Sequence, residues 1–417
     1  METRGVGAFT VSPTAGRGGD LRWRVLAAVL TAAVLTVTAG CSHKSNPSWQ
    51  GGTGGGGVAV SPSPKPKPAS VAVVQPAPNA KDVEPTTDIK YKSDDPEKTS
   101  VVVKDSSGDE VHGWLNRGKK TWRAAKAFDW GATYTITVNG TATEEKVGTI
   151  TTSFTVMAKP AKLVRVSSFL GDGATVGVGM PLIVKFSRSI PQNSRATVER
   201  RMIVTSTPAQ VGTWHWMSST EVHYRPKSFW KAGSKVTYTI KLQGVPIGDG
   251  WYGRYDLSVS IRIGRAFVMT VSNQTKSMTV TENGKAINTI PVSLGKDSTP
   301  SSSGTMVVIE KKLHTVFDTL EELGPEEGYR TDIDYAQRIT WSGQFIHAAP
   351  WSEGVQGKVN VSHGCVNVSE AMGKWLFDRT MMGDPITVSG TGSPLKWGNG
   401  WTDWNVSYDQ YKKGSAL

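Results

Sequence analysis

The stretch Ser362-His363-Gly364-Cys365-Val366-Asn367 holds the one cysteine that we expect in the mature body of this chain. The only other cysteine, Cys41, ends an N-terminal apolar segment, a position typical of a processing site. Cysteines of exported proteins are usually paired, because a free thiol outside the cell is exposed to oxidation. A single thiol retained two residues after a histidine therefore indicates chemistry, since the thiolate is a good nucleophile.

The composition favours a mostly β protein with a folded core. Hydrophobic residues make up 38% and charged residues 20% of the 417 residues, and the 45 glycines and 15 tryptophans suit turns and aromatic packing. The length corresponds to about two to four domains. The net charge of +12 indicates attraction to anionic surroundings. For an exported chain these are anionic lipid and cell-wall polymers, so we expect no nucleic-acid partner.

The N-terminal segment 1–41 resembles a bacterial lipoprotein signal. Arginines precede an apolar stretch, Val25 to Val37, that is short for a transmembrane span. In such signals cleavage precedes the cysteine, here Cys41, which then takes a lipid, although Thr38 stands where leucine is usual. The resemblance implies a lipid-anchored protein on the outer face of the cell membrane, in the cell wall. An ordinary secretory signal, or an uncleaved anchor with Cys41 incidental, is the alternative.

Residues 42–80 are a predicted flexible linker, because their glycine run and their alternating prolines cannot bury a core. Beyond the linker an internal repeat begins. Trp122 to Phe128 precedes a glycine and the strand-like Tyr134 to Val138, and Tyr224 to Trp230 precedes a glycine and Tyr238 to Leu242.

This spacing predicts two β-sandwich domains, over 81–160 and 161–264. We expect them to project and orient a catalytic domain rather than to bind ligands. His215 and His223 lie in strand-like segments of the second copy and are expected to be packing or surface residues rather than metal ligands.

From about residue 265 the pattern predicts strands and one short helix. Alternation from Phe267 to Thr281 is followed by Asn283-Gly284, a dipeptide typical of tight hairpin turns. Apolar spacing from Ser369 to Met381 predicts a helix just after the cysteine motif. The catalytic domain is expected to cover 265–390, and 391–417 to form a C-terminal extension that packs on it.

The thiol needs a base. A free thiol with a pKa of about 8.5 is only slightly ionised at neutral pH, and a nearby imidazole raises that fraction by forming an ion pair. His347, at the end of an apolar strand, and His363 are the candidates. Gly364 lets backbone N–H groups approach a substrate carbonyl oxygen, and Asn367 could orient a histidine or cap the following turn. A zinc site of His347, His363 and Cys365 lacks a clear fourth ligand, so we expect no metal.

These residues resemble the signature of the L,D-transpeptidase catalytic domain of the YkuD type. The resemblance covers about 265–413 and rests on the cysteine motif with His347 eighteen residues upstream. It extends through segments 328–332, 347–352, 403–405 and 408–410. The implied fold is mainly β. Two Ig-like β-sandwich domains precede a YkuD-type β-rich catalytic domain with a short helix after the nucleophile, as in actinobacterial lipoprotein members.

The resemblance implies a cell-wall enzyme that needs no cofactor or metal and is acylated by carbapenems. Cys365 matches the nucleophile, which attacks the carbonyl of the third residue of a peptidoglycan stem tetrapeptide, so that D-alanine leaves and a thioester forms. An amine of a second stem resolves the thioester as a cross-link between third residues. His347 matches the general base, and His363 and Gly364 match positions that shape the site and the oxyanion hole. The substrate-contacting or pocket-lining positions are Tyr329, Trp351, Ser362, Asn367 and Ala348.

Ala348 departs from the serine that often follows the base histidine. If that residue acts through its backbone carbonyl, alanine costs little; if the hydroxyl matters, His347 is less firmly held and turnover is slower. His314 lies in the segment that forms a flap over the pocket in the family, and we assign it no catalytic role.

Two other functions stay open. A peptidoglycan L,D-carboxypeptidase or endopeptidase would use the same thiol and base with water as the acceptor. A non-catalytic wall-binding lipoprotein would use its sandwiches to bind and carry a degenerate C-terminal domain.

Overall fold

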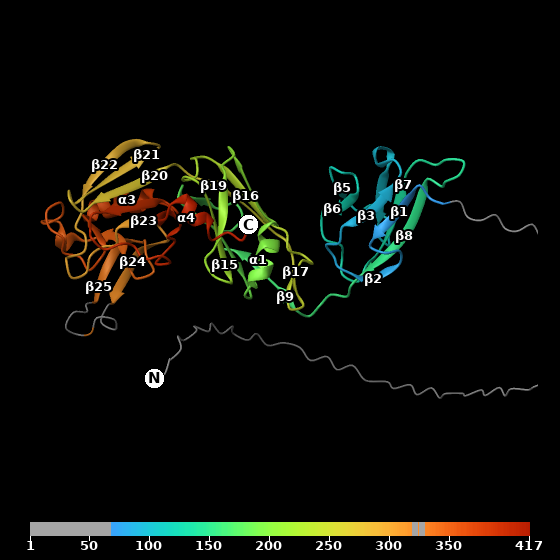
Figure 1. Cartoon of the computed structure of the whole chain (residues 1–417). Helices are drawn as coiled ribbons and strands as arrows, with labels where there is room; N and C mark the ends of the chain where they lie inside the picture. Colours follow the sequence, from blue (N-terminus) through green and yellow to red (C-terminus); the bar gives the residue numbers. More distant parts are fainter. Residues whose placement is uncertain (1–67, 319–323, 325–329) are drawn as a thin grey trace, which may run out of the picture. The chain divides into compact units, whose positions relative to one another are not determined.

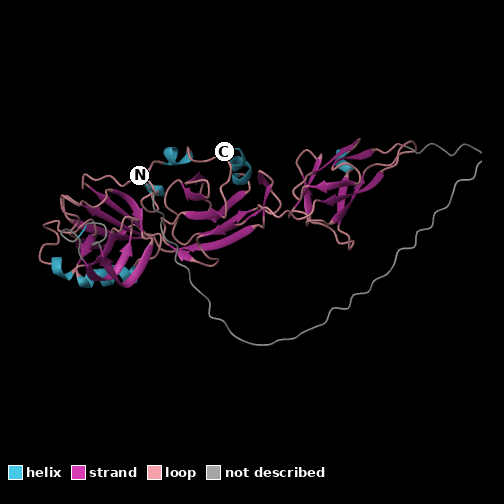
Figure 2. Cartoon of the chain, turned by 90° about the horizontal axis from the view of Figure 1, so that it is seen from below, coloured by secondary structure: helices cyan, strands magenta, loops and turns pink. Residues whose placement is uncertain are grey.

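The computed structural model describes residues 68–318, 324 and 330–417. Contacts divide the chain after Pro64, and all described residues belong to the unit Lys65–Leu417. Strands dominate this unit, as Figures 1 and 2 show. No helix in the described ranges is long and apolar enough to cross a bilayer.

The first sandwich packs two four-stranded sheets, with strand orders β1-β3-β6-β5 and β2-β8-β7-β4. Apolar residues of both sheets form one core cluster, with Ile89, Val103 and Ile136 fully buried. Its elements are β1 (Val71–Gln75), β2 (Ala80–Val83), β3 (Ile89–Ser93), η1 (Pro96–Lys98), β4 (Ser100–Lys104), β5 (Gly113–Leu115), β6 (Thr121–Ala124), β7 (Thr133–Asn139) and β8 (Thr149–Val156).

This sandwich begins earlier in the chain than the sequence indicated. Strand β1 lies inside the range 42–80 that we assigned to the linker, and Ala69 already forms a bridge to Val147. Val71 and Val73 alternate with exposed residues and enter the core. The prolines just before this strand hid its short alternation, because proline favours extended linker.

The second sandwich repeats the first with additions. Its sheets have the orders β10-β12-β15-β14 and β11-β19-β16-β13, and a small sheet, β17-β18-β9, lies beside them. The elements are β9 (Leu163–Val164), β10 (Val166–Ser168), β11 (Thr175–Val176), β12 (Leu182–Phe186), α1 (Gln192–Glu199), β13 (Met202–Thr207), β14 (Gly212–Trp216), β15 (Glu221–Pro226), β16 (Lys235–Ile240), β17 (Pro246–Gly248), β18 (Trp251–Gly253) and β19 (Leu257–Ile263).

The predicted internal repeat corresponds to two similar turns, each with a glycine of positive φ before a strand. Gly131 and Gly233 have φ of 72° and 76°, the left-handed region that glycine enters without strain. Each precedes a strand whose first aromatic, Tyr134 or Tyr238, is buried in its sandwich. The repeat thus marks equivalent turns that deliver a tyrosine to each core.

The C-terminal domain is built from two sheets and a helix. A five-stranded sheet has the order β22-β21-β20-β28-β23, and a four-stranded sheet has the order β24-β25-β26-β27. The elements are β20 (Phe267–Ser272), β21 (Ser277–Glu282), β22 (Lys285–Pro291), β23 (Gly304–Val307), β24 (Glu310–Asp318), β25 (Arg330–Arg338), β26 (Phe345–Ala348), η2 (Pro350–Ser352), β27 (Val366–Val368), α3 (Glu370–Arg379) and β28 (Pro385–Ser389).

The hairpin turn and the helix of this domain follow the sequence prediction. Asn283 and Gly284 both have positive φ between β21 and β22, as a tight hairpin turn requires. Helix α3 begins after Ser369, whose side chain accepts a hydrogen bond from the Met372 backbone N–H. Its Gly373 lies directly against Ala348, because a Cβ built there would be 2.8 Å from the Ala348 Cβ. The helix therefore packs on the strand that carries His347.

The segment 391–417 contacts the C-terminal domain, on which we expected it to pack, and it also contacts the second sandwich. It carries η3 (Asp403–Asn405) and α4 (Tyr408–Lys412). The side-chain oxygen of Asn405 accepts from the Thr305 N–H of the C-terminal domain at 3.2 Å. The indole of Trp404 donates to the Gly179 carbonyl of the second sandwich at 2.6 Å. The extension thus joins the second sandwich to the C-terminal domain.

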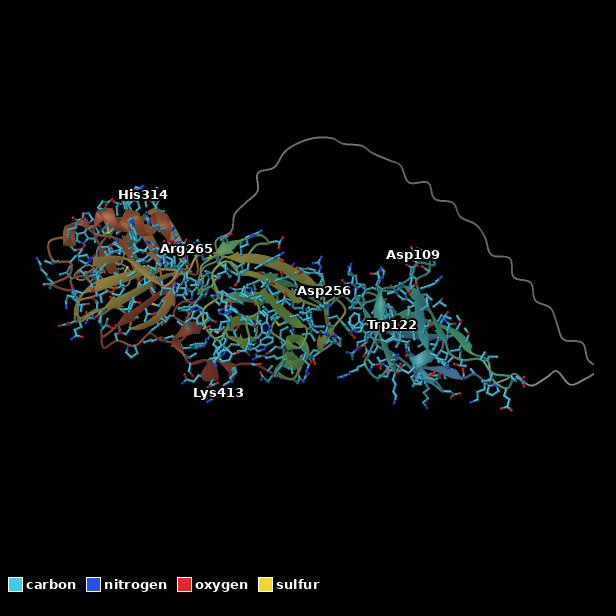
Figure 3. All side chains as sticks on the ribbon, turned by 90° about the horizontal axis from the view of Figure 1, so that it is seen from above. Asp109, Trp122, Asp256, Arg265, His314 and Lys413 are labelled. Carbon is cyan, nitrogen blue, oxygen red and sulfur yellow. The ribbon has the colours of Figure 1, made fainter. Side chains whose placement is uncertain are left out.

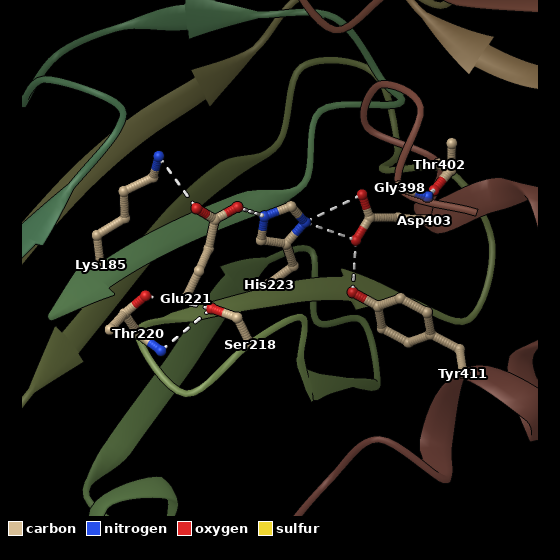
Figure 4. A network of polar contacts seen from close by, with 9 residues as sticks. All are labelled: Lys185, Ser218, Thr220, Glu221, His223, Gly398, Thr402, Asp403 and Tyr411. Carbon is tan, nitrogen blue, oxygen red and sulfur yellow. Dashed lines mark hydrogen bonds and ion pairs between the residues drawn. The ribbon is translucent and has the colours of Figure 1, made fainter. Parts of the chain in front are cut away.

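A buried charge network lies where the extension meets the second sandwich (Figure 4). The His223 ring is 2% exposed; its Nδ1 lies 3.0 Å from Asp403 Oδ1 and its Nε2 lies 2.8 Å from Glu221 Oε1. The Tyr411 hydroxyl donates to Asp403 at 2.6 Å, and Lys185 pairs with Glu221 at 3.0 Å. His223 is thus a packing residue, as expected, but a charged one.

The charge of His223 follows from its two carboxylate neighbours. Burial alone would lower the pKa of this histidine, but Asp403 and Glu221 outweigh burial and raise the pKa to about 9. The hydrogen bond from His223 in turn lowers the pKa of Glu221 to about 2. The imidazolium is therefore a buried cation at neutral pH, held between two anions.

Asp403→Asn should destabilise this junction strongly. The amide keeps the side-chain shape but leaves the buried imidazolium without its main counter-ion, a loss of about 3–5 kcal/mol in the free energy of unfolding. Denaturant unfolding at neutral pH measures the effect. Asp378→Asn, which removes the partner of exposed Lys374, is the control and should cost no more than about 0.5 kcal/mol.

The difference in stability between wild type and Asp403→Asn should depend on pH. The pKa of folded His223 lies above its unfolded value of about 6.5. Its stabilisation is therefore complete below about pH 6.5 and is lost as the pH rises through about 9. The gap between wild type and Asp403→Asn should narrow at about pH 10, and an undiminished gap there would show that His223 is not the charged partner.

Candidate active site

Cys365 and His347 line the same cavity in the C-terminal domain. The cavity has a volume of about 420 Å³. Strand β26 carries His347. Cys365 lies in residues 362–365, which lead into β27 and are called the nucleophile loop below. The lining residues are Phe317, Thr331, His347, Trp351, Val361, Ser362, His363, Cys365 and Asn367.

The Cys365 thiol is buried rather than surface-accessible. The residue is 6% exposed and belongs to a small apolar cluster with Ile333, Ala336 and Phe345. Its Sγ donates a long hydrogen bond to the Gly343 carbonyl at 3.8 Å. Burial raises the pKa of this thiol to about 12, against smaller lowering effects from its neighbours. The thiol is therefore neutral in the free protein.

The His347 ring is held by backbone and flanked by aromatic rings. Its Nδ1 donates to the Ala348 carbonyl at 2.7 Å, which leaves Nε2 as the basic nitrogen of the neutral ring. Phe317 meets the ring edge to face at 5.5 Å between centroids, and Trp351 lies 6.0 Å away. Burial lowers the pKa of His347 to about 4, although the Ala348 carbonyl and Asn367 partly oppose this change.

The protonation states differ from the ion pair that the sequence suggested. We expected the imidazole to raise the thiolate fraction, yet both Cys365 and His347 are neutral at pH 7. The reason is burial, which penalises the thiolate of Cys365 and the imidazolium of His347 more than their neighbours compensate. The sequence shows that a histidine is available to the thiol, but it does not show how deeply the two groups are buried.

The nucleophile loop is closed by Ser362. Its hydroxyl donates to the Cys365 carbonyl at 2.7 Å and accepts from the Gly364 N–H at 3.1 Å. The Gly364 N–H is therefore engaged with Ser362 in this structure, and the expected part of Gly364 in an oxyanion hole stays a prediction. Gly364 has a φ of 121°, a conformation that favours glycine, and an added Cβ would lie 3.3 Å from Gln344.

Not all of the other predicted site residues line the cavity. Trp351, 59% exposed, and the exposed His363 line the cavity beside the thiol. Ala348 contributes its carbonyl to His347, while its side chain is buried against helix α3 and does not face the cavity. Tyr329 and Cys41 lie outside the described residues.

Asn367 lies beside His347 because their strands are parallel neighbours. His347 and Asn367 are partners in the β26–β27 register, and the Asn367 side chain raises the pKa of the ring. Its Nδ2 donates to the Ser352 hydroxyl at 3.4 Å. Its Oδ1 is buried and has no hydrogen bond of good geometry from any residue in the described ranges.

Three cavity residues were not among our predictions. Phe317 and Thr331 come from β24 and β25, a long hairpin in which they are register partners. Val361 precedes the nucleophile loop and is 39% exposed. Alternation in β24 was the available signal, but charged residues along that strand masked it. His314 stands at the surface of this hairpin and pairs with Asp334 (Figure 3).

The titratable side chains of the site do not form a metal centre. Within residues 68–318, 324 and 330–417, no three histidine, cysteine, aspartate or glutamate side chains gather as a metal ion would require. His347 and Cys365 meet His363 at the cavity without a carboxylate in its lining. The arrangement offers a neutral nucleophile and a neutral base in an apolar, partly enclosed space.

Comparison with known proteins agrees with this geometry. Residues 266–388 match the L,D-transpeptidase catalytic domain (YkuD), and residues 80–246 match the bacterial Ig domain (Big_10). The chain is 34% identical to L,D-transpeptidase 2 of Mycobacterium tuberculosis (strain CDC 1551 / Oshkosh) over 326 residues, covering 76% of this chain and 78% of that protein. It is 32% identical to L,D-transpeptidase 5 of M. tuberculosis (strain ATCC 25618 / H37Rv), covering 82% and 76%.

A solved structure, LD transpeptidase LdtMt1 in complex with imipenem, shares 32% identity with a TM-score of 0.47, covering 55% of this chain and all of that one. The coverage and identity of the two full-length relatives, together with the cavity that holds Cys365 and His347, lead to one conclusion. The chain belongs to the L,D-transpeptidase family.

Proposed function

We propose that this protein cross-links peptidoglycan stem peptides through a thioester on Cys365, with His347 as the general base. The observation that carries the proposal is that a buried thiol and a buried imidazole line one cavity in a chain of this family. The donor is a stem tetrapeptide and the acceptor is the side-chain amine of another stem.

The neutral state of the pair sets the order of events. His347 accepts the thiol proton as Sγ bonds to the carbonyl carbon of the third donor residue, so charge appears only when substrate is present. The tetrahedral intermediate then collapses, the C–N bond to D-alanine breaks, and His347 returns the proton to the leaving amine. A thioester on Cys365 remains.

The second half reverses these roles. The acceptor amine attacks the thioester carbonyl, and His347 takes a proton from that nitrogen. The C–S bond breaks as the new amide forms, and His347 gives the proton to sulfur, which restores the thiol. The apolar rim of Phe317, Trp351 and Val361 limits water near the thioester, which favours the amine over hydrolysis.

The backbone carbonyl of Ala348 orients the His347 ring, a role that we had also considered for a serine hydroxyl at this position. A carbonyl can only accept, so it fixes the proton on Nδ1 and leaves Nε2 to take the thiol proton. The alanine at this position therefore removes no interaction that the ring needs. This supports the alternative in which alanine costs little.

We further propose that the chain is exported and held at the membrane by a lipid on Cys41, with both sandwiches as spacers. The support is the signal-like segment 1–41 and the proline- and glycine-rich segment after it. In cells fed with labelled palmitate, wild type should carry label in the membrane fraction and Cys41→Ala should carry none. Label retained by Cys41→Ala would overturn the anchor.

Cys365→Ser should abolish cross-linking while the protein stays folded. Serine matches the shape of the buried cysteine but is a far weaker nucleophile without a strong base, so no acyl-enzyme should accumulate. Incubation with purified tetrapeptide stems and mass analysis separates dimers from tripeptides, which are the product of hydrolysis. Wild type should give dimers; tripeptides alone would favour the carboxypeptidase, and dimers from Cys365→Ser would remove the mechanism.

His347→Gln should lower the rate of acylation by imipenem by about two to four orders of magnitude, as loss of a general base does. Because burial lowers the pKa of His347 to about 4, the base stays neutral down to that pH and the acid limb of the wild-type rate should lie near it. Stopped-flow acylation from acid to neutral pH measures both effects. His112→Gln, an exposed histidine of the first sandwich, is the control; a loss below about tenfold for His347→Gln would move the base role to His363.

A further inference from the structure

A buried polar cluster lies directly behind the base and has no place in the chemistry described above. Ser352 is 2% and Gln356 is 8% exposed, and both follow β26 in the turn that contains η2. Neither side chain belongs to the cavity lining. Ser352 instead accepts from Asn367, which is the register partner of His347, and Gln356 is linked to Asn367 only through Ser352.

The hydrogen bonds of this cluster converge on one hydroxyl and one carbonyl. The Ser352 hydroxyl donates to the Ala349 carbonyl at 3.0 Å. Gln356 Nε2 donates to the same carbonyl at 3.3 Å and to Ser352 Oγ at 3.1 Å. Asn367 Nδ2 also donates to Ser352 Oγ, at 3.4 Å. The Ala349 N–H donates to the Val368 carbonyl at 2.8 Å. The cluster is therefore connected to β27 as well as to β26, which Ala349 follows directly.

Counting donors and acceptors fixes the direction of the Asn367 amide. A hydroxyl has one proton, and Ser352 gives it to the Ala349 carbonyl, so Ser352 Oγ can only accept from other groups. If the Asn367 amide were turned over, its oxygen would face an oxygen with no proton to offer. The amide nitrogen must therefore face Ser352, and the amide oxygen remains for the imidazole side.

We propose that Ser352 and Gln356 are positioning residues for catalysis, which hold the Asn367 amide with its oxygen towards His347 and so favour the imidazolium formed when the thiol proton is transferred. The proposal rests on the proposed role of His347 as base. An amide oxygen beside the ring opposes the burial that makes a charged ring costly. The interaction gains strength only as charge develops, so it favours the transition state over the ground state.

The cluster also has a simpler role, which the test must separate from the proposed one. Its bonds to Ala349 stabilise the turn that carries Trp351, and a structural role would predict only lost stability. The proposed role predicts a change in the protonation behaviour of His347. The other titratable groups that line the cavity are Cys365 and His363. The Cys365 thiol donates to the Gly343 carbonyl, so its hydrogen bond does not involve Ser352 or Gln356.

The test is the pH dependence of acylation by imipenem, with the limiting rate and the non-covalent dissociation constant measured separately. Ser352→Ala frees the Asn367 amide, so the limiting rate should fall by about 10- to 100-fold while the dissociation constant changes little. The acid limb should move to lower pH, because the contact that raises the pKa of His347 is weakened. Gln356→Met should change the rate and the limb in the same direction.

A double-mutant cycle then shows whether Ser352 acts through Asn367. If it does, Ser352→Ala should add less than about twofold to the loss caused by Asn367→Ala alone. Ser234→Ala is the matched control, since Ser234 is a fully buried serine of the second sandwich whose hydroxyl also donates to a carbonyl. That control should lose stability without any change in the acid limb.

Each outcome is decisive. An unmoved acid limb in Ser352→Ala, or losses that add fully to those of Asn367→Ala, would overturn the positioning role and leave a purely structural one. Those results would leave the proposed function intact, because wild type would still be acylated at Cys365. Failure of wild type itself to form an adduct on Cys365 would overturn both the proposed function and this inference.

Discussion

The site depends on the parallel pairing of two short strands. β26 and β27 align Ile346 with Val366, His347 with Asn367 and Ala348 with Val368. A slip of one residue would turn His347 to the opposite face of the sheet and separate it from the cavity. The register is fixed because Ile346, Val366 and Val368 all enter the core, and because the Asn367 backbone also exchanges hydrogen bonds with Ser293. Hydrophobic burial on one face thus determines the chemistry on the other.

Burial in turn explains why the resting site is uncharged. A thiol with a pKa of about 12 and an imidazole with a pKa of about 4 form no ion pair before substrate arrives. A permanently charged thiolate would be more reactive towards oxidants than the neutral thiol is. Burial outweighs the neighbouring dipoles, because the Ala348 carbonyl and the Asn367 side chain only partly offset the lowering of the His347 pKa.

The sequence predicted the local features whose cause is local. The motif around Cys365, the Asn283-Gly284 turn, the capped helix after Ser369 and the glycine turns of the repeat each depend on neighbouring residues. It could not predict features that depend on distant partners. The buried environment of Cys365 and the contact of Phe317 with the His347 ring arise only from tertiary packing.

The C-terminal extension is another feature that depends on partners distant in the sequence. Segments 403–405 and 408–410 were part of the family resemblance, although none of their residues lines the cavity that holds Cys365. They bind the extension to the second sandwich. Arg225 of that sandwich lies over the rings of Trp404 and Tyr411 and donates to the Val406 carbonyl at 3.0 Å. The His223–Asp403 pair is a further contact between the two. A buried cation matched to buried anions is costly to separate. The extension therefore ties the second sandwich to the C-terminal domain through hydrogen bonds to both.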